Sequence, residues 1–249
     1  MKKLNSPEAF DELLALSGAT MEVRSGAPVR KIFNGRRHRP VGLYPSAKND
    51  QMVAWESRLE RRTLRWLEVD PSVIRFLEQP HHLRFPFMGR TTRYTPDFSV
   101  TTAVGTYYIE VKYRGDLFRM EPDDRARLKR ARSLYRQAGS DLVFVTDLRF
   151  KTNARWHDNA QLVEDARRAH ANRDEIAALV SHLEERQEST IGDCSLAIDD
   201  AVDGLNKILA LMIRRLVSVN LNETVGPQTS VSLTPDYASV LAAVAVRAR

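Results

Sequence analysis

The pattern of apolar and polar residues divides the chain into a strand-rich first part and a helix-rich second part. Apolar runs that are rich in β-branched and aromatic residues predict strands at 73–77, 83–87, 94–100, 106–111 and 142–146. Helical patterns are found at 7–16, 49–69 and 122–138. The segment 49–69 contains no Gly or Pro, so we predict one continuous helix there. The order of helix, strands, helix and strand predicts an α/β (α+β) domain that ends near residue 150.

Helical patterns dominate the second part. They predict helices at 155–171, 173–186, 190–198 and 203–217. Two β-like runs follow at 217–221 and 229–233, and Gly226-Pro227 lies between them. Three of these helices followed by a hairpin predict a small winged-helix-like module. We therefore expect a basic N-terminal segment (1–48), an α/β domain (49–150), a winged-helix-like domain (151–235) and a C-terminal helix or tail (236–249).

The composition limits the class of protein. Hydrophobic residues make up 43% of the 249 residues, which is enough to build a core. The single cysteine, Cys194, excludes an intramolecular disulfide and a cysteine-based zinc site, and it is typical of a reducing cytoplasm. Asp11 and Glu12 interrupt the first apolar run, and no run has the ~18 apolar residues of a membrane span. We expect a cytoplasmic protein.

The charge balance favours a polyanionic partner. The formal net charge is +6, and the segment 29–40 (VRKIFNGRRHRP) concentrates positive charge beside Gly and Pro. Its cationic residues are Arg30, Lys31, Arg36, Arg37 and Arg39. Such a segment can follow a phosphate backbone, but a solvated arm explains it equally well.

The strand TYYIEVK (106–112) carries the first candidate chemistry. Side chains alternate between the faces of a strand, so Glu110 and Lys112 share one face while Ile109 and Val111 point to the other. A carboxylate and an ammonium group two residues apart can both reach one water molecule or metal ion. Taken alone, the pattern is more often that of a solvated strand face.

A second carboxylate strengthens the hypothesis. Asp97 lies in YTPDFSV, thirteen residues before Glu110, which leaves room for two antiparallel strands and a turn at 103–105. Asp97 would then lie beside Glu110 at the open end of the strand pair. Two adjacent carboxylates repel each other unless a cation lies between them, and hard oxygen ligands favour Mg²⁺ or Mn²⁺. The two motifs together indicate a metal site.

The predicted helix 49–69 offers a third carboxylate. Its apolar stripe contains two glutamates among the residues Val53, Glu56, Glu60, Leu64 and Leu67. Burying an unpaired carboxylate is costly, so a metal ion or an arginine has to neutralise it. The alternative is that both glutamates lie at the edge of the stripe and pair with Arg62 or Arg65.

These motifs resemble a known family. A helix Glu, then Pro-Asp, then Glu-x-Lys is the order of the PD-(D/E)XK nuclease superfamily. The segments ESRLERRTLRWLEVDPSVIRFLEQP, RYTPDFSV and YYIEVK resemble more closely TnsA, the endonuclease subunit of heteromeric (Tn7-like) transposases. The resemblance covers about 45–235 and is strong in its first part. It implies a restriction-endonuclease-like mixed sheet flanked by helices, followed by a small winged-helix-like domain.

The resemblance also implies roles for individual residues. Glu60, Asp97, Glu110 and Lys112 would be catalytic. Asp97, Glu110 and the carbonyl of Val111 would hold one Mg²⁺, which Mn²⁺ can replace, and Glu60 would hold a second ion directly or through water. The position of Glu110 is occupied by Gln in some members, and Glu56 has no role in the pattern.

The resemblance further implies a task and partners. The protein would cut the 5′ (non-transferred) strands at transposon ends in double-stranded DNA, in the bacterial cytoplasm and at the nucleoid. A TnsB-type DDE transposase would cut the other strands, and a TnsC-type AAA+ ATPase would be a regulator. Two alternatives stay open: a stand-alone restriction or repair endonuclease, and a non-catalytic DNA-binding subunit. The four intact residues argue against the second.

Other polar residues have more ordinary explanations. His81 and His82 alternate across a strand, so we expect structural or surface roles for them. Lys207, Arg214 and Arg215 on the helix 203–217 fit partner binding as well as DNA reading. The cationic residues of the helix 122–138 fit a solvated face or a DNA-flanking surface, and they are Arg125, Arg127, Lys129, Arg130 and Arg132.

Overall fold

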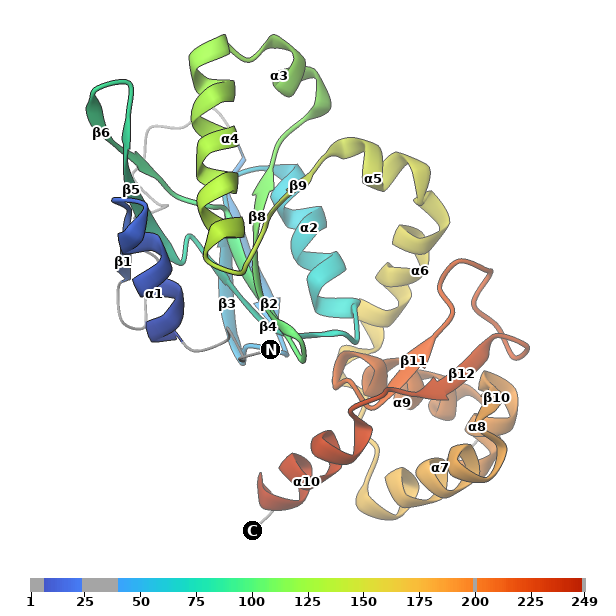
Figure 1. Cartoon of the computed structure of the whole chain (residues 1–249). Coiled ribbons are helices and arrows are strands. Elements are labelled where there is room, and N and C mark those ends of the chain that lie inside the picture. The colour runs from blue at the N-terminus through green and yellow to red at the C-terminus, as the bar shows by residue number, and fades with distance from the viewer. Residues whose placement is uncertain (1–6, 24–39, 199–200, 248–249) are drawn as a thin grey trace. The chain divides into compact units, whose positions relative to one another are not determined.

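The computed structural model describes residues 7–23, 40–198 and 201–247 (Figure 1). Contacts divide the chain into two compact units. The first comprises 1–44, 52–63 and 75–149, and the second comprises 45–51, 64–74 and 150–249. The main break therefore falls at residue 150. The basic run at 29–39 lies outside the described residues.

The main sheet of the first unit is mixed. Its strand order is β4-β7-β8-β9, with β4 at Val73–Glu78, β7 at Phe98–Thr102, β8 at Gly105–Val111 and β9 at Leu142–Val145. Strands β7 and β8 form an antiparallel hairpin in which Thr102 lies opposite Gly105, so the turn lies at 103–104, within the predicted 103–105. Strand β9 runs parallel to β8. This pairing brings Asp97, Glu110 and Lys112 to the end of the hairpin that lies away from the turn.

A second sheet and two helices enclose the core of this unit. The sheet has the order β1-β5-β6, with β1 at Thr20–Val23, β5 at His81–Phe87 and β6 at Arg90–Tyr94. Helices α1 (Pro7–Leu16) and α4 (Pro122–Gln137) pack their apolar residues against β5, β6, β8 and β9. In Figure 1, α4 runs along the strands in front of β8. The N-terminal helix and β1 are therefore part of the α/β core, and they do not form a separate arm.

The predicted continuous helix 49–69 is wrong in its first third. Residues Gln51–Trp55 form a strand, β3, which pairs with β2 (Gly42–Ser46), and helix α2 spans only Arg58–Val69. Ser57 caps the helix, since its Oγ accepts a hydrogen bond from the Glu60 N–H at 3.1 Å. The stripe from 53 to 67 is consequently not one helical face. The Ser-x-x-Glu signature was the available sign of this helix start.

The predicted strand 94–100 is two strands. Strand β6 ends at Tyr94, where it pairs with Leu83, and β7 begins at Phe98, where it pairs with Ile109. Pro96 lies between them and has no N–H to donate to either sheet. This crossing from one sheet to the other places Asp97 immediately before β7. Two short helices, α3 (Arg114–Arg119) and α5 (Asp147–Thr152), were not predicted at all.

The second unit is built from helices around a small sheet. Its elements are α6 (Ala154–Asp165), the 3₁₀ turn Ala166–Arg168, α7 (Arg173–Arg186), β10 (Glu188–Thr190), α8 (Ile191–Ile198), α9 (Ala201–Ile213), β11 (Val217–Val219), β12 (Ser230–Leu233) and α10 (Tyr237–Arg247). The sheet order is β10-β12-β11. The predicted helices and hairpin are present, with β10 as an additional strand. The winged-helix assignment stays a prediction. No helix in the described ranges is long and apolar enough to cross a membrane.

Close packing of α8 against α9 makes one glycine critical. A Cβ on Gly204 would lie 2.7 Å from the Cα of Ser195 and 2.9 Å from its carbonyl oxygen. Gly204→Ala should therefore lower the free energy of unfolding by about 1–3 kcal/mol, despite the higher helix propensity of alanine. Urea unfolding measures this. Gly226→Ala is the control, because nothing lies within 4 Å of a Cβ there. Equal stability of both variants would contradict the tight α8–α9 contact.

Candidate active site

Glu110 and Lys112 meet at the end of β8. Glu110 is buried, with 4% of its surface exposed, and its Oε1 lies 2.7 Å from the Nζ of Lys112. The two side chains therefore share one face. The backbone N–H of Lys112 donates to the carbonyl of Val145 at 3.1 Å, which anchors this end of the strand to β9.

Asp97 reaches the same end of the hairpin. Its N–H donates to the carbonyl of Ile109 at 2.9 Å, and its Oδ2 accepts a hydrogen bond from the N–H of Val111 at 2.6 Å. Burial raises the pKa of Asp97 well above its ordinary value of 3.8, and the charge of Glu110 raises it further. Lys112 and the Val111 N–H oppose this shift only in part. The fold thus holds a carboxylate where ionisation is unfavourable without a cation.

Tyr94 is a site residue that the sequence did not reveal. Its hydroxyl donates to the Oε2 of Glu110 at 2.5 Å, and 4% of the residue is exposed. Burial and the neighbouring Glu110 raise the pKa of Tyr94 well above 10, so the hydroxyl stays a donor. With Oε2 bound to Tyr94 and Oε1 to Lys112, both oxygens of Glu110 are held in fixed directions. A tyrosine near Asp97 in sequence carries no signal of this contact, because it depends on the crossing from β6 to β7.

Glu60 has a structural task at the start of α2. Its Oε2 accepts from the N–H of Glu56 at 2.8 Å, and its Oε1 accepts from the hydroxyl of Ser57 at 3.0 Å. The expected alternative pairing with Arg65 is not seen, because that guanidinium binds Glu164 at 2.7 Å. Burial raises the pKa of Glu60, although these two hydrogen bonds oppose the shift. Glu60 is therefore a helix-capping residue that also faces the site.

The three carboxylates and Lys112 act on one another electrostatically. The charges of Glu110 and Glu60 both raise the pKa of Asp97. Among the described residues, however, no three His, Cys, Asp or Glu side chains are grouped closely enough to hold a metal ion by themselves. Asp97 and Glu110 are the pair that the hairpin brings together, and Glu60 approaches from α2. The metal assignments stay predictions.

The donor set has the chemistry of a Mg²⁺ or Mn²⁺ site. Carboxylate and carbonyl oxygens are hard ligands, and these ions keep several waters as further ligands. A cation beside Asp97 would also relieve the unfavourable ionisation of that half-buried carboxyl. Asp97, Glu110 and the carbonyl of Val111 therefore fit such an ion.

Several of the other candidate residues have intramolecular partners. The Nε2 of the buried His81 lies 2.7 Å from the hydroxyl of Tyr135, and the Nδ1 of His82 contacts the hydroxyl of Thr95. The two rings are therefore separated, as predicted. Arg125 donates to carbonyls at the end of α3, at Leu117, Phe118 and Met120. Three cations of the second unit are also engaged: Lys207 with Glu175, Arg214 with the carbonyl of Ala169, and Arg215 with Asp236. These intramolecular contacts account for the side chains without a bound ligand.

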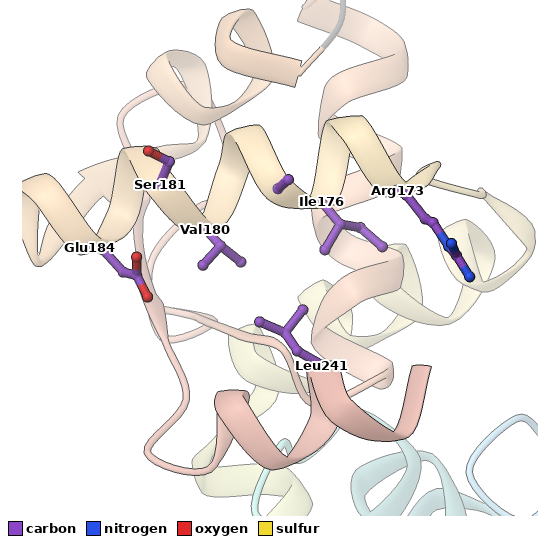
Figure 2. Close-up of a pocket in the computed structure, with 7 residues that line it drawn as sticks. Arg173, Ile176, Val180, Ser181, Glu184 and Leu241 are labelled. Carbon is purple, nitrogen blue, oxygen red and sulfur yellow. The ribbon is translucent and has the colours of Figure 1, made fainter. Parts of the chain in front are cut away.

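A cavity in the second unit is a different kind of site. It has a volume of ≈ 410 Å³ and lies between α7 and α10 (Figure 2). Figure 2 shows Ile176 and Val180 from α7 pointing toward Leu241 from α10. Its lining is mainly apolar and contains none of the predicted catalytic residues. The cavity therefore does not contribute to the carboxylate site.

Comparison with known protein families finds a match for the segment that carries most of this site. Residues 70–147 match the family described as the TnsA-like endonuclease N-terminal domain. This segment is therefore similar to a TnsA-like endonuclease domain. Asp97, Glu110 and Lys112 lie within the match, whereas Glu60 precedes it. No curated protein matches the chain. The TnsA-like domain supports a nuclease role in Tn7-like transposition.

The raised pKa of Asp97 predicts how stability depends on pH. A carboxyl whose pKa is raised by folding stabilises the fold fully below its unfolded pKa, and this contribution is lost as pH rises from about 3.9 through the folded value. Asp97→Asn abolishes that loss. In chelator at pH 7.5, the variant should melt on the order of a few degrees above the wild type, and the gap should shrink toward pH 4.

Thermal unfolding at several pH values measures this difference. Asp123→Asn is the matched control, because Asp123 is exposed on α4. A wild-type protein that is as stable as Asp97→Asn at every pH would show that ionisation of Asp97 is not unfavourable.

Proposed function

We propose that this protein is a Mg²⁺-dependent DNA endonuclease that cleaves the 5′ (non-transferred) strands at transposon ends, together with a DDE transposase. The observation that carries the proposal is the cluster of Asp97, Glu110 and Lys112 inside a TnsA-like domain. The domain match supports a nuclease. The cluster supports phosphodiester hydrolysis, because it combines ligands for a hard cation with a fixed ammonium group.

The mechanism follows from what each side chain can hold. Asp97, Glu110 and the carbonyl of Val111 would hold one Mg²⁺, and Glu60 a second, directly or through water. When bound, the metal supplies Lewis acidity and lowers the pKa of a bound water. Tyr94 and Lys112 orient the Glu110 carboxylate by their contacts with its two oxygens. Hydrolysis would leave a 3′-OH and a 5′-phosphate, without a covalent enzyme intermediate.

Lys112 acts in this scheme as a cation. Burial opposes its charge, but the neighbouring carboxylates of Glu110 and Asp97 more than offset burial and raise its pKa. An ammonium group with a raised pKa is not a general base at neutral pH. Lys112 would instead orient the attacking water and stabilise negative charge that develops on the phosphate.

The proposed partners follow from the family and its task. A TnsB-type DDE transposase would cut the 3′ ends and a TnsC-type AAA+ ATPase would regulate the complex. Double-stranded DNA at the transposon ends would be the substrate. Efficient cutting without any partner would favour a stand-alone restriction or repair endonuclease. DNA binding without cleavage, even with the transposase added, would favour a non-catalytic subunit.

The proposal predicts metal-dependent cleavage that fails in site variants. Asp97→Asn and Lys112→Ala should each lower the cleavage rate by about 10²–10³-fold, because each removes a group that binds the metal or the developing charge. Supercoiled plasmid and transposon-end DNA are incubated with Mg²⁺ or Mn²⁺, with and without the transposase, and nicked products are quantified. Asp123→Asn should cleave like the wild type. Cleavage at the wild-type rate by either site variant would contradict the assignment of these residues to the nuclease site.

Loss of the Tyr94 hydroxyl should change the Mg²⁺ concentration that cleavage requires. Tyr94→Phe removes the hydroxyl that holds Oε2 of Glu110, so it should raise the Mg²⁺ concentration at half-maximal rate by about 10-fold. Tyr135→Phe is the matched control, since it also deletes a buried hydroxyl but one that binds His81. A metal titration of the cleavage rate distinguishes them. The role of Tyr94 is contradicted if the two variants need the same Mg²⁺ concentration as the wild type.

A further inference from the structure

Gln79 lies at a junction that the proposed mechanism does not use. It follows β4 and precedes Pro80, and its backbone has φ 40°, in the left-handed region that residues other than Gly avoid. It is buried, with 7% of its surface exposed. A long polar side chain in a strained backbone inside the core needs a compensating interaction.

The backbone of Gln79 is tied to the residue that carries the site. Its N–H donates to the carbonyl of Asp97 at 2.8 Å. The N–H of Asp97 itself donates to the carbonyl of Ile109, on β8, at 2.9 Å. The peptide groups of Asp97 are therefore held from both neighbouring strands, and the left-handed turn at Gln79 is part of that arrangement.

The side chain of Gln79 reaches the start of α2. Its Nε2 donates to the Oε1 of Glu56 at 3.3 Å. The N–H of Glu56 in turn donates to the Oε2 of Glu60 at 2.8 Å. One residue thus links the backbone of Asp97 to the loop that orients Glu60. Glu56, which has no role in the family pattern, is the intermediate in this link.

The orientation of the amide is determined by its partner. A carboxylate accepts hydrogen bonds, so the nitrogen of the amide faces Glu56. The other end, Oε1, is buried and has no hydrogen-bond donor among the residues that the structure describes. An acceptor left in this state costs about 1–3 kcal/mol, so stability alone does not explain the choice of Gln here.

We propose that Gln79 is a positioning residue for the nuclease site, acting through Glu56 to align Glu60 with Asp97. The proposal rests on the proposed endonuclease function. It explains why a residue with a buried side-chain amide occupies a turn whose backbone is strained. Without the amide, Asp97 keeps its backbone contacts, but the loop at Glu56 loses its tether to them.

The test exchanges the two partners. Gln79→Glu places two carboxylates face to face, so it should lower the cleavage rate by about 10–100-fold and raise the Mg²⁺ requirement. Glu56→Gln keeps an acceptor but replaces the carboxylate with a weaker, neutral amide oxygen, so its effect should be smaller. The double variant Glu56→Gln/Gln79→Glu restores a donor and an acceptor with their positions exchanged. We expect it to recover a rate within about threefold of the wild type.

Two further variants separate positioning from backbone strain. Gln79→Gly accepts the positive φ without strain but has no amide, so it should remain impaired while its melting temperature is at least that of Gln79→Glu. Gln187→Ala is the matched control, because Gln187 also has a left-handed backbone, with φ 60°, but is exposed in the second unit. Gln187→Ala should cleave like the wild type.

The outcomes decide between the two proposals. Every reaction contains the transposase, and Asp97→Asn is measured in parallel. If Asp97→Asn cleaves as fast as the wild type, the endonuclease assignment fails and the Gln79 proposal falls with it. If Asp97→Asn is inactive but the double variant is no better than Gln79→Glu, or Gln79→Gly is fully active, only the role of Gln79 is wrong.

Discussion

The repulsion between Asp97 and Glu110 is the constraint on which the site depends. The β7–β8 hairpin ends with both carboxylates close together, and burial makes the ionisation of Asp97 unfavourable. Lys112 compensates for part of this charge through its contact with Glu110 at 2.7 Å. A protein gains no stability from such an arrangement. In the proposed role as a binding site for a divalent cation, the same negative charge would favour binding.

The rest of the first unit holds these carboxylates against their repulsion. Asp97 is fixed by the N–H groups of Gln79 and Val111, while Tyr94 and Lys112 hold the two oxygens of Glu110. Helix α4 and the sheet β1-β5-β6 bury the tyrosine behind the site, so that its hydroxyl stays protonated. The site is thus preorganised by backbone hydrogen bonds and by one buried phenol, and both are costly to move.

The sequence predicted which side chains meet at the site better than it predicted the local structure around them. Alternation along β8 placed Glu110 and Lys112 on one face, and the spacing to Asp97 predicted the hairpin. The helix 49–69 was overextended, because the strand β3 contains no Gly or Pro and its apolar residues continue the helical period. Tyr94 and Gln79 could not be found, since their contacts depend on the crossing between sheets and on a left-handed turn. Local periodicity does not encode such long-range contacts.

Direct binding of Mn²⁺ tests the central claim that this carboxylate pair holds a cation. The protein without DNA is titrated with Mn²⁺, and the free ion is followed by electron paramagnetic resonance. The wild type should remove Mn²⁺ from solution in a saturable manner, and a variant that combines Asp97→Asn with Glu110→Gln should not, although both proteins are folded. Equal uptake by the two proteins would contradict the account, because the ion would then bind elsewhere.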